Sequence, residues 1–186
     1  MATHIEPLLT IADLDSMPDD GNRYEVIEGE LFVSCSPNRT HQTVSGNIFF
    51  SVRSYLIDNP IGEIWATPGV IFSEYSGVIP DLVYVSHARR SEIASGDRII
   101  GAPDLVIEIV SPGADNERRD RLVKRQLYGK HGVKEYWIVD FHNRTIEVYV
   151  LQGQMLQLQG ILTEKDELTS SVLPGFRCKV ETLFAI

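Results

Sequence analysis

A repeated tetrapeptide constrains the fold of this chain more than any other feature. Residues 80–83 and 103–106 both read Pro-Asp-Leu-Val, and the second copy continues through Ile107, Glu108, Ile109 and Val110. Short apolar runs of this kind predict two strands that each begin with an acid, and the second strand carries another acid inside it. Burying a carboxylate among valine and isoleucine costs free energy unless a cation, a metal ion or a proton compensates it. Glu108 is therefore the residue whose environment must be explained.

Composition limits the class of protein. With 186 residues, of which 43% are hydrophobic and 23% charged, we expect a single domain spanning residues 1–186 with a core of its own. Cys35 and Cys178 lie far apart, which favours neither a zinc knuckle nor a disulfide scaffold and makes the cytoplasm the expected location. The segment from Met1 to Leu14 lacks the pattern of a secretory signal. No apolar run approaches the roughly 20 residues that span a bilayer, so we expect no membrane association.

The net charge of −9 bears on nucleic acid. Broad, salt-dependent binding to nucleic acid gains its affinity from phosphate neutralisation by Lys and Arg. A chain this acidic therefore needs a local basic surface or a bound metal ion to meet a phosphodiester.

Hydrophobic periodicity predicts a mixed α/β (α+β) fold, with a central mixed sheet flanked by helices and an N-terminal β-hairpin. The hairpin turn falls at Glu28-Gly29, and Gly132 stands where a helix C-terminus is expected. No second domain is indicated after residue 151, where we expect a short closing segment. The predicted strands are 24–27, 30–34, 64–67, 69–72, 81–85, 104–110, 135–140 and 145–151. The predicted helices are 40–57 and 115–131, and a polar excursion spans residues 86–98, before the second acidic strand.

Strand geometry selects the partner of Glu108. Side chains alternate along a strand, so Asp104, Val106, Glu108 and Val110 share one face. Asp104 and Glu108 are then about 13 Å apart along the strand, too far to share one ion readily. If the strand after Asp81 pairs beside this one, the Asp81 carboxylate approaches Glu108 across the interstrand spacing of about 5 Å. Such a pair could hold a hard divalent ion through oxygen ligands.

A cation that stabilises developing charge is the missing part of this site. The position two residues beyond Glu108 on the same face would suit it, but Val110 stands there. If the following helix begins near Asn116 and folds back over the sheet, Lys124 lies about 12 Å along its axis, which returns it to the neighbourhood of Glu108. We therefore expect Lys124 to reach the acid.

An ordered series of motifs now points to a family. The series contains Pro80-Asp81, the run from Pro103 to Pro112, Lys124 and the following elements: Gly29-Glu30-Leu31, Ser36-Pro37 with His41, Arg119-Asp120, Tyr128, Gly132-Val133 and the run from Glu135 to Asp140. Over most of its length the sequence resembles the Uma-type family of restriction endonuclease-like proteins, whose fold belongs to the PD-(D/E)XK nuclease group.

This resemblance implies a fold and a chemistry. In the nuclease pattern an Asp that opens one strand and an acid on the next strand bind Mg²⁺, while a lysine supports the attacking water. By position, Asp81 and Glu108 resemble the metal ligands, Val110 departs from the pattern at the usual lysine position, and Lys124 takes the displaced role. We expect Mg²⁺ or Mn²⁺ as cofactor and DNA as substrate, with catalytic residues Asp81, Glu108 and Lys124. A homodimer would supply the two centres that cleavage of both strands needs.

Two other functions remain open. A nuclease-derived binding or regulatory module would keep the sheet and its acids for stability or ligand contact and would show no metal-dependent turnover. A metal-dependent hydrolase of another phosphorylated substrate is the third reading.

Structural interpretations also remain for the site residues. Pro-Asp at a strand entrance is often a turn or cap, which would explain Asp81 and Asp104. Glu108 could form an ion pair with a helix lysine or arginine, and Lys124 could pair with Asp120 on a solvated face at the i, i+4 spacing.

The neighbouring candidates have similar alternatives. His41 could cap a helix, Glu30 could be a hairpin surface acid or a remote member of a metal cluster, and Tyr128 could pack in the core or support the site by a hydrogen bond. The basic residues of the second helix are either a solvated face or contacts to the nucleic-acid backbone; they are Arg118, Arg119, Arg121, Lys124 and Arg125.

Overall fold

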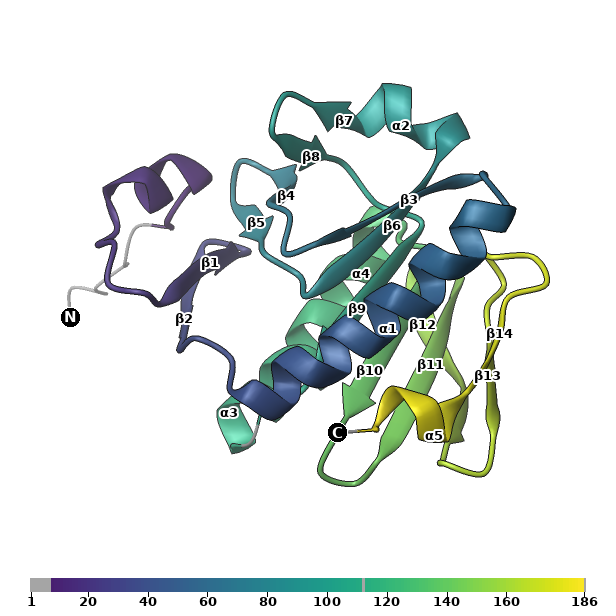
Figure 1. Ribbon diagram of the computed structural model, residues 1–186. Coiled ribbons are helices and arrows are strands. Elements are labelled where there is room, and N and C mark those ends of the chain that lie inside the picture. Colours follow the sequence, from purple (N-terminus) through teal and green to yellow (C-terminus); the bar gives the residue numbers. More distant parts are fainter. Residues whose placement is uncertain (1–7, 112, 186) are drawn as a thin grey trace.

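The computed structural model of the protein describes residues 8–111 and 113–185 (Figure 1). Pro112, which was expected to help end the second acidic strand, lies outside these residues, as do the first seven residues of the N-terminal segment that lacks a secretory signal pattern. In the described part no helix is long and apolar enough to cross a membrane.

A six-stranded mixed sheet, the central sheet, carries the two acidic strands. Its order is β12-β11-β10-β9-β6-β3, in which β9 and β10 are parallel and the other neighbours antiparallel. The strands are β3 (Gly62–Ala66), β6 (Leu82–Ser86), β9 (Leu105–Ile109), β10 (Glu135–Asp140), β11 (Thr145–Gln152) and β12 (Met155–Leu162). The predicted mixed sheet is confirmed, and the two Pro-Asp-Leu-Val segments form neighbouring strands.

The N-terminal hairpin belongs to a second six-stranded sheet, the hairpin sheet. Its turn is tight because Glu28 and Gly29 both have positive φ, 52° and 82°, as a two-residue hairpin turn of type I′ requires. The sequence predicted the hairpin but not its extension into the order β2-β1-β5-β4-β8-β7. The strands are β1 (Arg23–Ile27), β2 (Glu30–Ser34), β4 (Val70–Ser73), β5 (Ser76–Val78), β7 (Ala94–Ser95) and β8 (Arg98–Ile100).

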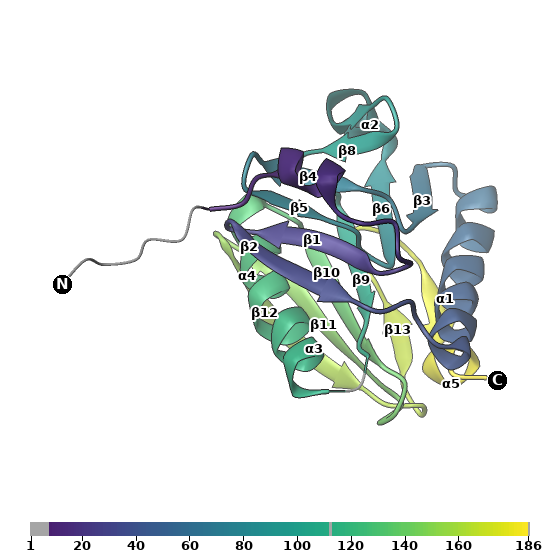
Figure 2. The same cartoon turned by 90° about the vertical axis from the view of Figure 1, so that its left-hand side faces the viewer.

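Helices cover both faces of the central sheet (Figure 2). On one face α1 (Arg39–Asp58) packs its apolar stripe against Leu105, Ile107 and Ile109, together with the closing segment, which contains β13 (Glu167–Thr169), β14 (Arg177–Lys179) and α5 (Val180–Leu183). The opposite face is covered by a continuous helical segment made of α3 (Ala114–Arg118), η2 (Arg119–Lys124) and α4 (Arg125–His131). Val106 and Val110 lie on that second face, so the alternation predicted along the strand is confirmed.

Three segments differ from the sequence prediction. The polar excursion 86–98 contains a short helix, α2 (His87–Ile93), and the two short strands that extend the hairpin sheet. The strand β12 was not predicted: apolar and polar residues alternate only from Leu156 to Gln159, and apolar residues stand on both sides of the strand, most of which is exposed. A short 3₁₀ helix, η1 (Ile11–Ser16), lies across the hairpin sheet, where Ile11 approaches Gly77 so closely that a side chain at position 77 would clash.

Candidate active site

The strand register brings Asp81 and Glu108 to opposite positions. In the antiparallel pair of β6 and β9, Leu82 lies opposite Ile107, so the residues next to them, Asp81 and Glu108, also face each other. The backbone amide of Ile109 donates a 2.9 Å hydrogen bond to Asp81 Oδ2 across this boundary. The predicted meeting of the two acids is therefore present in the structure.

Asp81 is buried, and both of its carboxylate oxygens have partners. Its Oδ1 accepts a 2.9 Å hydrogen bond from Arg23 Nη1, and its Oδ2 lies 3.1 Å from His41 Nε2. Burial alone would raise the pKa of Asp81, but the hydrogen bond and charge of His41, the Ile109 amide and Arg23 outweigh it and lower the pKa to about 2. Asp81 therefore remains a carboxylate over the whole physiological range.

Glu108 has the opposite electrostatic behaviour. Its Oε1 accepts hydrogen bonds from Lys124 Nζ at 3.0 Å and from the Tyr128 hydroxyl at 2.7 Å. Burial raises the pKa of Glu108 to about 7, although the Lys124 ammonium acts against the rise; the charge of Asp81 adds to it. Two facing carboxylates thus titrate far apart, which is characteristic of functional sites.

A π-helical turn delivers Lys124 to the acids. The segment η2 has π geometry between α3 and α4, and such turns occur frequently at functional sites. It turns both Asp120 and Lys124 inward, where their relative exposures are 1% and 2%. The Tyr136 hydroxyl donates a 2.9 Å hydrogen bond to the Asp120 carbonyl oxygen within this turn. Asp120 itself pairs with Arg119 at 3.0 Å, and Lys124 does not lie on a solvated face.

Glu25 is a member of the site that the sequence prediction missed. Its Oε1 accepts hydrogen bonds from Lys124 Nζ at 2.9 Å and from the Ile79 amide at 2.7 Å. Glu25 and Arg23 alternate with Tyr24 and Val26 on β1, so both point to the same side of the hairpin. The signal was that spacing, an acid and a base two residues apart in a strand that also contains buried Ile27.

The side chains around the facing acids carry charges of both signs. Four carboxylates, those of Glu25, Asp81, Glu108 and Asp120, meet three permanent cations, those of Arg23, Arg119 and Lys124. His41 adds a buried ring whose Nδ1 has no hydrogen-bond partner among the described residues. We call this set of eight side chains the acid centre. Burial raises the pKa of Asp120. Burial acts to lower the pKa of Lys124, but the charges of Glu108 and Glu25 outweigh it and hold that pKa above its ordinary range.

The acid centre encloses a small polar cavity of about 20 Å³, bordered on the outer side by Ser34, Cys35, Pro37 and Ser111. That volume has room for about one water molecule. Within the described residues no group of three or more His, Cys, Asp and Glu side chains is arranged to hold a metal ion. The donor chemistry nevertheless fits a hard divalent ion, because two carboxylates suffice when water and a substrate phosphate supply the other ligands.

The remaining candidates lie elsewhere or act as supports. Asp104 has a structural role outside the acid centre. Lys134 Nζ and the Ser86 amide donate hydrogen bonds to its two carboxylate oxygens at 2.6 and 2.7 Å, which fixes the start of the strand. Glu30 is an exposed hairpin residue. The amide of His41 is capped by Asn38, whose Oδ1 accepts its hydrogen bond at 2.9 Å.

Most of the basic helix residues are already paired within the molecule. Arg121 contacts Asp140 at 2.9 Å and also pairs with Glu147, and the Arg125 guanidinium lies 5.2 Å from the centre of the Tyr149 ring. Arg118 is exposed. These residues therefore do not form the uniform free basic surface that backbone contacts would need.

Comparison with known proteins identifies the class of this fold. It is the restriction endonuclease-like α+β fold: a solved structure of a putative nuclease from Anabaena variabilis ATCC 29413 matches with a TM-score of 0.75 and 19% sequence identity, over 95% of this chain and 97% of that chain. The sequence model of the Uma2 family, described as putative restriction endonuclease, matches residues 11–181. The chain belongs to that family, as its motifs indicated. A search of curated proteins found no match.

Family membership carries two general statements. Restriction endonuclease-like proteins generally use divalent metal ions, and their family implies a DNA substrate. What these residues do in this chain follows from their geometry.

Proposed function

We propose that this protein is a Mg²⁺-dependent endonuclease, able to use Mn²⁺, that hydrolyses phosphodiester bonds in DNA. The observation that carries the proposal is the opposed pair of Asp81 and Glu108 on neighbouring strands, with Lys124 Nζ 3.0 Å from Glu108. Asp81 and Glu108 would hold the ion. When bound, such an ion lowers the pKa of a coordinated water and neutralises charge on the scissile phosphate.

Each side chain has a separate task in this proposal. Asp81, a permanent carboxylate, supplies the fixed negative charge of the site. Glu108 exchanges its proton for the ion, because its pKa of about 7 lies close to neutrality. Lys124 orients the attacking water and stabilises the charge that develops on the phosphate, and Tyr128 holds the Glu108 carboxylate in place.

The partly exposed cations account for how an acidic chain meets DNA. The side chains of Arg23 and Arg119 retain 23% and 11% of their exposure at the border of the acid centre. A phosphate placed there would meet two guanidinium groups, which bind phosphate oxygens well. Local charge rather than net charge thus supports the interaction.

We further propose that the chain acts in the cytoplasm as one endonuclease-like domain that pairs into a homodimer through β12. This strand is an edge of the central sheet, and its sequence Met-Leu-Gln-Leu-Gln-Gly-Ile-Leu contains no charged residue and no proline. Edge strands that remain unpaired usually carry such residues to prevent association. Three of its apolar side chains are 47–66% exposed; they are Met155, Leu158 and Ile161.

A cleavage assay with a matched variant tests the proposed chemistry. Wild-type protein is incubated with plasmid and with linear DNA in Mg²⁺ or Mn²⁺, beside Glu108→Gln and Glu135→Gln. Glu135 is a control because it is equally buried on the neighbouring strand, but binds Trp137 and Ser171 instead of the acid centre. We expect cleavage by the wild type and by folded Glu135→Gln, and loss of cleavage in Glu108→Gln. A folded wild type that cleaves in neither metal would favour the nuclease-derived binding module instead.

A further inference from the structure

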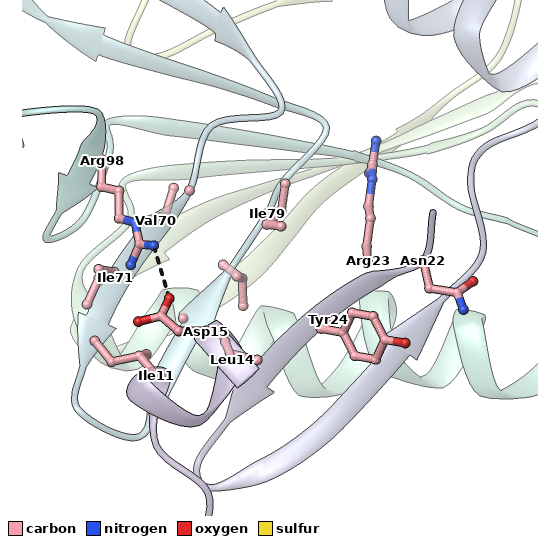
Figure 3. Close-up of a pocket in the computed structure, with 13 residues that line it drawn as sticks. Ile11, Leu14, Asp15, Asn22, Arg23, Tyr24, Val70, Ile71, Ile79 and Arg98 are labelled. Carbon is pink, nitrogen blue, oxygen red and sulfur yellow. Dashed lines mark ion pairs between the residues drawn. The ribbon is translucent and has the colours of Figure 1, made fainter. Parts of the chain in front are cut away.

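A second cavity adjoins the acid centre, and Figure 3 shows the residues that line it. Its volume is about 310 Å³, which is within the range of small-molecule sites. It is formed where η1 covers the hairpin sheet over β4 and β5. Arg23 and Ile79 line both this cavity and the cavity of the acid centre, so the two share a wall.

The lining has apolar walls and polar ends. The apolar residues that line it are Ile11, Leu14, Val70, Ile71, Val78 and Ile79. Arg98 and Asp15 form an ion pair of 3.7 Å at one end, while Asn22, Arg23 and Tyr24 lie at the other. Figure 3 shows Ile79 between these two ends and the Arg23 guanidinium directed away from the Asp15 and Arg98 pair. That guanidinium binds Asp81, so one residue joins the cavity to the acid centre.

We propose that this cavity, the base pocket, binds one nucleobase of the DNA substrate in an unpaired, unstacked form. The proposal rests on the proposed function, because it assigns a role to the nucleotide next to the scissile phosphate. A base has two apolar faces and a polar edge, so it matches a slot with aliphatic walls and hydrogen-bonding groups at its ends. Arg98 and Asp15 supply a donor and an acceptor for that edge at one end of the cavity, and the Asn22 amide offers both at the other end.

Connectivity favours a nucleotide over an unrelated small molecule. In DNA the base and its phosphate are joined through a single sugar, so a phosphate at the border of the acid centre places its base a short distance away. The shared wall formed by Arg23 and Ile79 gives that spacing. Arg23 then contacts the sugar-phosphate between the two sites. Because Arg23 also binds Asp81, a nucleotide in the base pocket affects the acid centre through this one residue.

The test separates the base from the phosphate. Calorimetric titration in EDTA compares the four 2′-deoxynucleoside 5′-monophosphates with 2-deoxyribose 5-phosphate, which has the same sugar and phosphate but no base. The base adds two apolar faces and a polar edge that the sugar phosphate lacks, so we expect at least one nucleotide to bind about tenfold or more tightly than the sugar phosphate. Equal affinities, or no nucleotide binding at millimolar concentration, would overturn the proposal.

Paired tryptophan variants locate the binding. Leu14→Trp fills the base pocket and is expected to reduce nucleotide affinity about tenfold, to that of the sugar phosphate. Leu8→Trp makes the same change in the same segment at a residue that is 62% exposed and does not line the pocket, and should bind as the wild type does. Unchanged nucleotide binding by folded Leu14→Trp contradicts the assignment. Arg98→Ala, an exposed rim change, provides a second variant should Leu14→Trp not fold, and is expected to weaken nucleotide binding but not sugar-phosphate binding.

The two proposals fail differently. Nucleotide binding in EDTA needs no cleavage. A wild type that does not cleave DNA but still prefers nucleotides would therefore support the base pocket and contradict the proposed nuclease activity. A wild type that cleaves DNA but binds nucleotide and sugar phosphate equally would support the nuclease activity and contradict the base pocket.

Discussion

Replacing Lys124 by methionine removes the ammonium group that lies between Glu25 and Glu108, at 2.9 and 3.0 Å from their oxygens. Both acids are almost completely buried, so the substitution leaves two carboxylates without their shared cation. Breaking a buried ion pair typically costs about 3–5 kcal/mol. Methionine has a similar length and keeps the packing, so the lost charge dominates the change.

The protonation of Glu108 limits this cost. Because burial already raises its pKa to about 7, Glu108 in the variant can take up a proton at neutral pH rather than remain an unpaired charge. We therefore expect a loss of about 3 kcal/mol at neutral pH, the lower end of the range. The loss should become smaller as the pH falls below 7, since protonated Glu108 no longer needs the cation, and larger above it.

Urea denaturation measures the effect. With an m-value of about 2 kcal/mol per molar urea, the expected loss moves the midpoint down by about 1.5 M. Lys130→Met is the matched control, because Lys130 pairs with Glu28 at 3.0 Å while both side chains are more than half exposed. Such surface pairs contribute about 1 kcal/mol or less. Equal midpoints for the two lysine variants, or a Lys124→Met loss independent of pH, would refute the electrostatic reasoning.

Three shorter predictions concern other parts of the molecule. Tyr128→Phe removes the 2.7 Å hydrogen bond to Glu108 and should lower the free energy of unfolding by about 1.5 kcal/mol or more, measured by the same denaturation; no change would show that this bond contributes nothing. Mg²⁺ affinity, measured by calorimetry over a pH series, should rise as the pH increases to about 7 and then level off, because the ion must displace the proton of Glu108, whose pKa is about 7; affinity independent of pH would contradict the role of Glu108 as a ligand. Leu158→Lys places a charge on the exposed β12 edge and should convert the dimer to a monomer in analytical ultracentrifugation, whereas a monomeric wild type would exclude that interface.

The two acidic strands show how far sequence reasoning reaches. Alternation along Asp104–Val110 and the reach of the following helix were enough to separate Asp104 from the site and to bring Asp81, Glu108 and Lys124 together, because strand and helix spacings are nearly constant. The hairpin could also be predicted, because a two-residue turn requires positive φ and Glu28-Gly29 suits that requirement.

Other parts depend on contacts that local patterns do not encode. Glu25 joins the acid centre through the packing of the hairpin sheet against the central sheet, a long-range arrangement that the local spacing of Arg23 and Glu25 does not specify. The π turn at η2 is visible only in the backbone. The strand β12 carries apolar residues on both of its sides, so a period of two does not mark it.

The repeated Pro-Asp-Leu-Val supplies the most direct test of the central claim, that Asp81 and Glu108 form a metal-dependent nuclease centre. Asp81→Asn and Asp104→Asn make the same change at the same place in the two copies, each at a buried aspartate, with exposures of 4% and 2%. DNA cleavage in Mg²⁺ under single-turnover conditions is compared for the two folded variants and the wild type. We expect Asp104→Asn to cleave at a rate close to that of the wild type and Asp81→Asn to lose cleavage. Equal cleavage by both variants would contradict the account.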